Sequence, residues 1–383
     1  MADRIKRAIA LSLFAICAFF NFGNARPHYG PGQAQTDDSL SKWRPTLASS
    51  GARYVGSAVC ARCHTAEATQ LDTPMAHALR AAADCSILSA NTRMAFRNGP
   101  YTYQIARQGD RSIYSVSDGT NSISEPILYC FGKGVAGQTY VFQHNGNYYE
   151  SRVSYYEPLQ GLGITTLHSR SVPSSLEDAL GRPMNQETSK GCFACHSTGA
   201  PGGSELGIEK LSPGVSCEAC HGPGEKHIAA VRLKDPKDLR IFNPKKLDAL
   251  DQMQEFCGAC HMSFDAVMLL EDRGGLNNVR FQPYRMANSR GHLINDSRMS
   301  CVSCHDPHRE MVREASYYDS KCLACHVSSP KEPKTELRQA SGCPVSKQQC
   351  VTCHMPKVEV PDLNHKFTDH WIRIVRPGDP VPR

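Results

Sequence analysis

The chain has 383 residues, which by length alone is enough for two or three domains. It carries 43 Lys and Arg against 37 Asp and Glu, for a formal net charge of +6, and it contains 18 Cys and 16 His. Beyond the N-terminus it has no heptads, no repeats of fixed length and no long apolar spans. These absences exclude a coiled coil, a solenoid and a membrane span in the mature chain.

The first 25 residues have the pattern of a secretory signal. Three basic side chains among the first seven residues precede an apolar run at residues 8–20, and small residues follow at Gly23 and Ala25. The apolar run is too short to span a bilayer as a helix. We therefore predict a signal peptide at residues 1–25 and a mature protein that is periplasmic or extracellular.

Two segments of different composition follow. Residues 26–52 are rich in Pro, Gly and polar side chains, which predicts a flexible N-terminal arm. Residues 53–93 form the first haem segment, defined by the motif described next. Within it, residues 66–83 are rich in Ala, Leu and Gln and are predicted to form a helix that is interrupted at Pro74.

Seven pentapeptides along the chain share the pattern Cys-x-x-Cys-His. Their cysteines are Cys60, Cys63, Cys192, Cys195, Cys217, Cys220, Cys257, Cys260, Cys301, Cys304, Cys322, Cys325, Cys350 and Cys353, and their histidines are His64, His196, His221, His261, His305, His326 and His354. In this pattern two thiols about one helical turn apart add to the vinyl groups of a haem, and the adjacent imidazole binds the iron. The sequence therefore predicts seven covalently attached haem c groups.

Zinc binding and disulfide formation are the alternatives, because a Cys-x-x-Cys pair suits both. Every such pair in this chain is followed directly by His, which neither alternative requires. This regularity favours haem attachment. Three other cysteines, Cys85, Cys130 and Cys343, remain outside the motifs and the signal peptide, and the sequence leaves open whether Cys85 and Cys130 form a disulfide or all three are buried thiols.

Residues 94–160 differ from the rest because β-branched and aromatic residues alternate there with polar ones. Asp118-Gly119 and Asn145-Gly146 are typical of hairpin turns. We predict a small β-rich insert that follows the first motif. Residues 161–383 contain the other six motifs among short helical patterns and Pro/Gly-rich loops, and are predicted to be a six-haem cytochrome domain. The fold class expected overall is mainly α, with much irregular loop, folded around its haems.

A low-spin electron-transfer haem needs a second axial ligand, for which His is a common choice. Nine histidines lie outside the motifs. His28 in the arm and His144 beside a hairpin turn are set aside, which leaves seven candidate distal ligands for seven haems: His77, His168, His227, His292, His308, His365 and His370. His308 lies three residues after His305, on the same side of that haem, so it is expected to serve a neighbouring one.

The positive charge does not indicate nucleic-acid binding. Residues 1–25 contribute +2 of the +6, and seven haems would add roughly 14 propionate charges against about seven positive charges on ferric cores. The holoprotein is therefore expected to be acidic. We expect redox proteins as partners, and the sequence leaves both their identity and the oligomeric state open.

Three tracts resemble bacterial multihaem cytochromes c, in the group related to the nitrifiers' tetrahaem cytochrome, pentahaem nitrite reductase and octahaem hydroxylamine oxidoreductase. They are residues 54–77, residues 217–227 with Cys-His-Gly-Pro-Gly, and residues 301–308 with Cys-His-Asp-Pro-His. The likeness spans about residues 54–375. It implies closely packed haem pairs and distal ligation by the histidines at His77, His227 and His308. The chain departs from the group's enzymes because it has no Cys-x-x-Cys-Lys motif and fewer motifs than the octahaem proteins.

These features predict an exported heptahaem cytochrome that carries single electrons between redox partners in respiration, with no catalytic residues. The alternative is a reductase that acts on a small nitrogen or sulfur oxyanion at one open haem. For that reading, the candidate proton donors beside the first haem are Tyr155, Tyr156 and His168. A haem-bearing scaffold is a third reading, but seven redox centres exceed what docking requires.

Overall fold

The computed structural model describes residues 43–46, 52–199, 207–233, 239–270, 275–290, 298–326 and 343–382. The predicted signal peptide, nearly all of the predicted arm and the candidate ligand His292 lie outside these residues. No helix in the described part of the chain has the length and apolar character that a membrane crossing needs.

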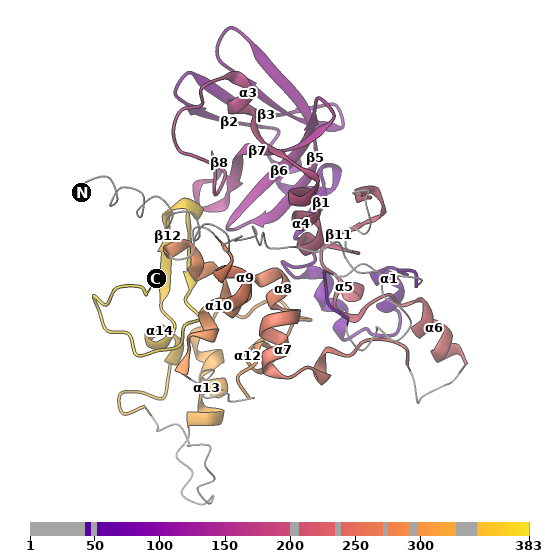
Figure 1. Cartoon of the computed structure of the whole chain (residues 1–383), viewed down its shortest axis with the longest axis vertical. Helices are drawn as coiled ribbons and strands as arrows, with labels where there is room; N and C mark the ends of the chain where they lie inside the picture. Colours follow the sequence, from indigo (N-terminus) through magenta and orange to yellow (C-terminus); the bar gives the residue numbers. More distant parts are fainter. Residues whose placement is uncertain are drawn as a thin grey trace, which may run out of the picture. The chain divides into compact units, whose positions relative to one another are not determined.

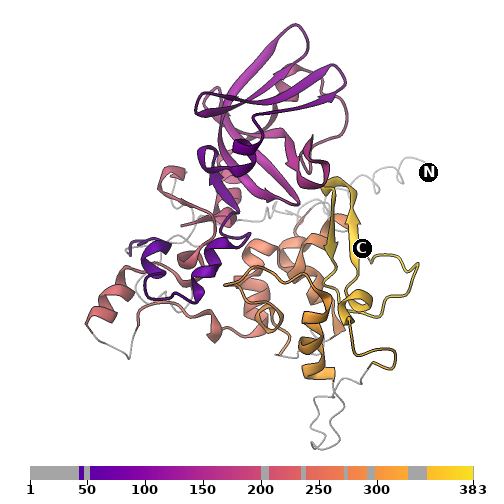
Figure 2. The same cartoon turned by 180° about the vertical axis from the view of Figure 1, so that it is seen from behind.

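The largest element is an antiparallel sheet of nine strands (Figure 1). Its strands are β1 (Leu79–Ala81), β2 (Arg93–Asn98), β3 (Tyr101–Gln108), β4 (Arg111–Ser117), β5 (Ser122–Gly134), β6 (Gly137–His144), β7 (Asn147–Tyr156), β8 (Gly161–Ile164) and β9 (Gly181–Met184). Strands β2 to β8 are hydrogen-bonded in chain order, β1 pairs with β5, and β9 pairs with β7. The sheet curls so that β2 contacts β8. Figures 1 and 2 show its strands in purple and magenta.

Alternating side chains build the core of this sheet. In β3, the side chains of Tyr101, Tyr103 and Ile105 are buried while their neighbours are not, as expected for a strand with one face against a core. Tyr103 lies opposite Val116 of β4, and Ile105 lies opposite Tyr114. Aromatic and β-branched pairs of this kind are the main side-chain stabilisation of a sheet.

The predicted fold class, mainly α with a small β-rich insert, is therefore wrong. The sheet recruits strands from outside residues 94–160, namely β1 before that segment and β8 and β9 after it. These strands are short, and β9, with the sequence Gly-Arg-Pro-Met, has no alternating pattern of its own. Such segments become strands only because β5 and β7 offer them hydrogen-bonding partners, which is information that local propensity lacks.

The helices are short. They are α1 (Ser57–Cys60), α2 (Ser86–Ala90), α3 (Leu176–Leu180), α4 (Gln186–His196), α5 (Cys217–His221), α6 (Glu225–Arg232), α7 (Ala249–Asp251), α8 (Gly258–His261), α9 (Phe264–Met268), α10 (Gln282–Ala287), α12 (Cys301–Cys304), α13 (Asp319–His326) and α14 (Cys350–His354). Two small ribbons accompany them, β10 (Ser197–Thr198) with β11 (Ser212–Pro213), and β12 (Lys357–Val360) with β13 (His365–Thr368). Single turns of 3-10 or π helix lie at η2 (Glu67–Asp72), η3 (Ala82–Asp84), η4 (Glu157–Leu159), η5 (Ile208–Lys210), η6 (Pro244–Lys246), η7 (Gln252–Phe256), η8 (Leu276–Arg280), η9 (Ala315–Tyr318) and η10 (Pro361–Leu363).

Two local predictions have opposite outcomes. The hairpin turns at Asp118-Gly119 and Asn145-Gly146 are confirmed, since β4 and β5 flank the first and His144 pairs with Asn147 across the second. The continuous helix predicted over residues 66–83 is wrong, because the only helical parts are η2 and the start of η3, both in the 3-10 form, and strand β1 lies between them. Pairing of β1 with β5 overrides the helical propensity of this Ala-rich stretch.

The cysteines outside the motifs have different environments. Cys85 and Cys130 are each only 1% exposed and belong to the core of the sheet, whereas Cys343 is exposed. The two buried thiols contact each other, and a hydrogen bond from Cys130 lowers the pKa of Cys85 to about 7. The expectation of three buried thiols therefore does not hold for Cys343.

One glycine allows a close contact between segments that are distant in sequence. Gly214 has φ +82°, and its amide donates to the carbonyl of His196 at 3.2 Å. A Cβ atom at this position would lie 2.0 Å from the carbonyl oxygen of Ala76. Only glycine at this position allows the segment that precedes the third motif to pack against residues 75–78.

We expect Gly214→Ala to lower the free energy of unfolding by about 2–4 kcal/mol, because it adds both overpacking and an unfavourable positive φ. The measurement is the shift of the denaturant midpoint of the holoprotein. Gly109→Ala is the matched control, since Gly109 also has positive φ, +61°, but nothing lies within 4 Å of its virtual Cβ. Equal losses in the two variants would contradict the packing argument.

Candidate haem-binding sites

The motif pentapeptides are built on helical turns. The amide of the motif histidine donates to the carbonyl of the first cysteine in the motifs at Cys60, Cys257 and Cys301, at 2.9 to 3.0 Å. A helical turn of this kind places the first and fourth residues on one face. Both thiols are thereby presented to the same side, as attachment to a single macrocycle requires.

Three imidazoles from outside the motifs face motif imidazoles. The ring centroids are 6.3 Å apart for His64 and His227, 6.1 Å for His221 and His308, and 6.2 Å for His305 and His370. Two imidazoles on opposite sides of one metal ion would have centroids about 6.3 Å apart, from metal–nitrogen bonds of about 2 Å and about 1.2 Å within each ring. All three separations match this value, so the residues fit a six-coordinate iron.

Several of these histidines are oriented by a hydrogen bond from Nδ1 to a backbone carbonyl. The bonds are His196 to Ala78 (3.0 Å), His221 to Phe242 (3.0 Å), His227 to Leu239 (2.8 Å), His354 to Arg373 (2.9 Å) and His370 to Thr368 (2.9 Å). A neutral imidazole that donates through Nδ1 has its lone pair on Nε2. This arrangement is usual for metal-binding histidine, because it fixes the tautomer and the direction of the ring.

Burial also favours the metal-binding form of the imidazole. Loss of solvent lowers the pKa of His196, His221, His261 and His305, and it lowers the pKa of His370 to about 4. The neutral ring is the form that offers a lone pair to iron.

The remaining candidate distal ligands have other neighbours. His77 lies in the turn before β1, and both of its ring nitrogens contact the guanidinium of Arg80. His365 stacks edge-on against Phe367, with centroids 4.7 Å apart. His144, set aside from the ligand set, contacts Glu125 through Nδ1 at 2.7 Å.

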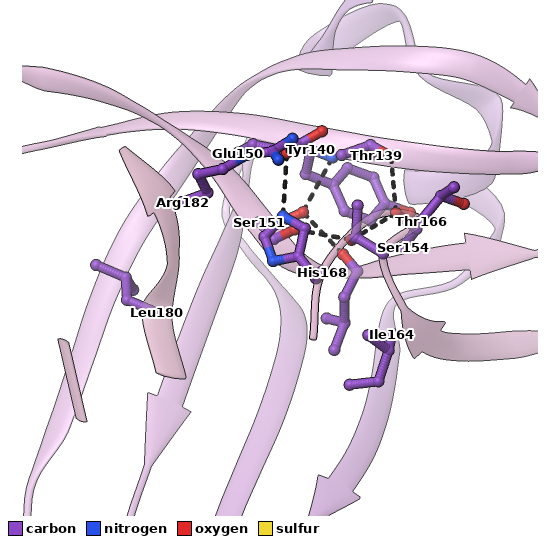
Figure 3. Close-up of polar contacts among 12 residues, drawn as sticks. Thr139, Tyr140, Glu150, Ser151, Ser154, Ile164, Thr166, His168, Leu180 and Arg182 are labelled. Carbon is purple, nitrogen blue, oxygen red and sulfur yellow. Dashed lines mark hydrogen bonds and ion pairs between the residues drawn. The ribbon is translucent and has the colours of Figure 1, made fainter. Parts of the chain in front are cut away.

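His168 and the two tyrosines considered as proton donors belong to the sheet. His168 Nε2 donates to Glu150 at 3.0 Å, as Figure 3 shows, and Glu150 also pairs with Arg182. Burial acts to raise the pKa of Glu150, but the hydrogen bond from His168 and the charge of Arg182 lower it overall. Tyr155 packs in the core of the sheet, and the hydroxyl of Tyr156 donates to the carbonyl of Ile164 at 2.8 Å.

The sheet packs against the second motif. Phe193, between the cysteines of that motif, is fully buried, and its ring meets Tyr129 and Phe131 of β5 edge-on at 5.3 Å and 5.1 Å. Phe131 also lies 5.1 Å from the ring of His196. Aromatic edge-to-face contacts of this kind are both apolar and directional, so they fix the second motif on the sheet.

Motifs that are distant in the sequence contact one another. Helix α1 of the first motif contacts α5 of the third, and α13 of the sixth contacts α14 of the seventh. Cys195 Sγ of the second motif donates to the carbonyl of Ala259 in the fourth at 3.6 Å. The structure therefore brings together motifs that are up to 157 residues apart, as 217 minus 60 gives for the first pair.

Sequence reasoning missed the side chains that hold motifs together. Glu218, inside the third motif, is 2% exposed and accepts hydrogen bonds from the amides of Val55, Gly56 and Gly224 at 2.7 to 2.8 Å. It thus holds the chain before the first motif against the third. Asp319 acts similarly by accepting from the amides of Gln349 and Cys350. The only signal in the sequence is that Glu218 is a charged residue inside a motif, a feature that it shares with Arg62 of the first motif.

The predicted arm also contributes to this region. Trp43 is 1% exposed, and its indole nitrogen donates to the carbonyl of Ala219 at 2.9 Å. It packs with Phe242 and Phe256, a cluster that also contacts Cys220 and Cys257. At least this residue of the arm is therefore part of the core beside the third and fourth motifs.

We expect Glu218→Gln to destabilise the holoprotein by about 1–3 kcal/mol, because one amide oxygen cannot replace a carboxylate that accepts three amide hydrogen bonds, and its NH₂ group would face a donor. The midpoint of thermal unfolding measures the effect. Glu67→Gln, at an exposed position on η2, is the control and should leave the midpoint unchanged. An unchanged midpoint for Glu218→Gln would show that these hydrogen bonds do not hold the two motifs together.

Comparison with known proteins agrees with the motifs. Residues 163–222, which contain the second and third motifs, match the family model for cytochrome c554 and c-prime. No curated protein and no solved structure matches the chain. The match supports a c-type cytochrome, a protein that binds haem covalently and takes part in electron transfer.

Proposed function

We propose that this protein is an exported electron carrier that holds seven haem c groups and passes single electrons between redox proteins in respiration. The observation that carries the proposal is the packing of Cys-x-x-Cys-His motifs against one another. The first motif contacts the third, the second contacts the fourth and the sixth contacts the seventh, so groups attached at these motifs would be neighbours. A haem, when bound, supplies reversible one-electron chemistry.

The geometry favours specific ligands for three of the sites. His227 would share an iron with His64, His308 with His221, and His370 with His305. Each pair joins different parts of the chain. His168, His292 and His365 remain ligands predicted from the count alone, and His77 remains one predicted from the count and from the resemblance.

The alternative, a reductase at an open haem, has less support. It requires proton donors that converge on one place. The three residues considered for that role are engaged within the sheet: Tyr155 in its core, Tyr156 with Ile164, and His168 with Glu150. We therefore propose electron transfer without bond chemistry.

Export is part of the proposal. The pattern of residues 1–25 supports it, and so does the chemistry, since haem c is attached outside the cytoplasm in bacteria. We propose a periplasmic or extracellular location and redox proteins of unassigned identity as partners.

The holoprotein, made in a bacterial host with haem-attachment machinery, tests the function directly. We expect seven haems per chain from the pyridine haemochrome absorbance and from the mass of the intact protein, and reversible reduction by a dye. Nitrite and hydroxylamine should not reoxidise the reduced protein catalytically. A lower haem count would contradict the cofactor assignment, and turnover of either compound would favour the reductase.

We expect His308→Met to raise the potential of a single haem, because a thioether ligand stabilises ferrous iron relative to imidazole. Potentiometry followed by EPR counts the altered haems. If His308 shares an iron with His221, the double variant with His221→Ala should also alter only one haem. Two altered haems would contradict the pairing. His144→Met is the control and should alter none.

A further inference from the structure

The C-terminal half contains a fully buried ion pair between two segments that are 84 residues apart. Arg285 on α10 is 1% exposed, and Asp369 after β13 is 0% exposed. The guanidinium binds the carboxylate through two hydrogen bonds of 2.8 Å, from Nε to Oδ1 and from Nη2 to Oδ2. A third donor, Nη1, donates to the carbonyl of Pro382 at 2.9 Å, so the same guanidinium also holds residue 382 in place.

Asp369 also organises the loop that follows it. Its carboxylate accepts from the amide of Trp371 at 3.0 Å and from Nη1 of Arg373 at 2.7 Å. The guanidinium carbons of Arg285 and Arg373 lie 5.0 Å and 5.6 Å from the indole ring of Trp371. The loop at residues 369–373 is therefore closed around a single carboxylate, with both lone-pair directions of each oxygen in use.

The loop carries His370, whose ring faces His305 at 6.2 Å. Ser289, just beyond α10, supports it on both sides: its hydroxyl donates to the carbonyl of His370 at 3.2 Å and accepts from the amide of Ile372 at 2.8 Å. Ser289, four residues after Arg285, thus holds the backbone on both sides of Trp371, including the carbonyl of His370.

The same loop reaches the seventh motif. The carbonyl of Arg373 accepts from Nδ1 of His354 at 2.9 Å, and the amide of Arg373 donates to the carbonyl of His354 at 3.2 Å. The amide of Asp369 donates to the carbonyl of Pro356 at 3.0 Å. One loop therefore orients an imidazole opposite the fifth motif and the motif imidazole of the seventh.

We propose that Arg285 and Asp369 are positioning residues that hold His370 opposite His305 and keep the carbonyl of Arg373 on His354. This inference rests on the proposed function, in which His305 and His370 share one iron. A buried ion pair is seldom the cheapest source of stability, since apolar residues of similar volume often serve as well. The two parallel hydrogen bonds do fix the position of Asp369 relative to Arg285. Through the loop that begins at Asp369, they fix the surroundings of both His370 and His354.

The test is Asp369→Asn in the full holoprotein. An Asn side chain keeps only one acceptor oxygen, and its NH₂ group would face N–H donors where the second oxygen had accepted two hydrogen bonds, so we expect His370 to lose its place. One haem of seven should lose its low-spin bis-His EPR signal and bind carbon monoxide in the ferrous state. A second haem, the one served by His354, should shift in potential. Arg285→Lys keeps the charge but loses the paired geometry, so the same changes should affect a fraction of the molecules.

Asp362→Asn is the matched control, because it removes an exposed ion pair with Arg170, 3.1 Å long, from the same C-terminal segment. It should change neither the EPR spectrum nor carbon monoxide binding. If Asp369→Asn yields no holoprotein, Ser289→Ala answers the same question, since it removes only the two hydrogen bonds beside His370. We expect the same haem to become reactive toward carbon monoxide in part of the molecules.

The variant His370→Ala distinguishes failure of the positioning role from failure of the proposed pairing of His305 with His370. If it opens one haem to carbon monoxide while Asp369→Asn and Ser289→Ala leave every haem as in the parent, the positioning role is overturned and the ligand pair stands. If His370→Ala itself opens no haem, the proposed pairing of His305 with His370 is overturned. An open haem in all three variants supports the positioning role.

Discussion

The pairing of imidazoles from different parts of the chain is the constraint on which the arrangement of the motif-bearing segments depends. His227 follows the third motif yet faces His64 of the first, and His308 follows the fifth motif yet faces His221 of the third. An iron between two such rings would be a crosslink between segments that are distant in the sequence. The connectors can therefore remain short, polar and rich in Pro and Gly, because a buried metal centre supplies what an apolar core supplies elsewhere.

The residues between the cysteines help to dock the second and third motifs. Phe193 inserts between Tyr129 and Phe131, Glu218 binds the amides before the first motif, and the carbonyl of Ala219 receives the indole of Trp43. The cysteines and histidine of a motif are the same seven times, so they cannot distinguish one position in the molecule from another. The two residues between the cysteines can, and the structure uses them for packing and capping.

The sheet is stabilised by side-chain packing and not by a metal centre between its segments. Tyr, Val, Ile and Phe side chains build its core, and several of its polar side chains pair within the sheet, as the bond from His168 to Glu150 illustrates in Figure 3. Contacts from β5 to Phe193 and His196 join it to the second motif. The sheet therefore supports that motif with an apolar surface of its own.

Residue types and spacing were sufficient to predict a c-type cytochrome and the hairpin turns at Asp118-Gly119 and Asn145-Gly146, and they named as candidate ligands His227, His308 and His370, which the structure places near motif imidazoles. These are local properties, since a thiol pair followed by an imidazole or an Asn-Gly dipeptide carries its meaning within a few residues. The size of the sheet was not predictable in this way, because β1 and β9 have weak patterns and exist through pairing with β5 and β7.

Which imidazole faces which, and the roles of Glu218, Arg285 and Asp369, were likewise decided only by the tertiary structure. A carboxylate in a sequence can bind water, an amide or a guanidinium equally well. Only the fold brings a particular donor within 3 Å of it and removes the water that would compete.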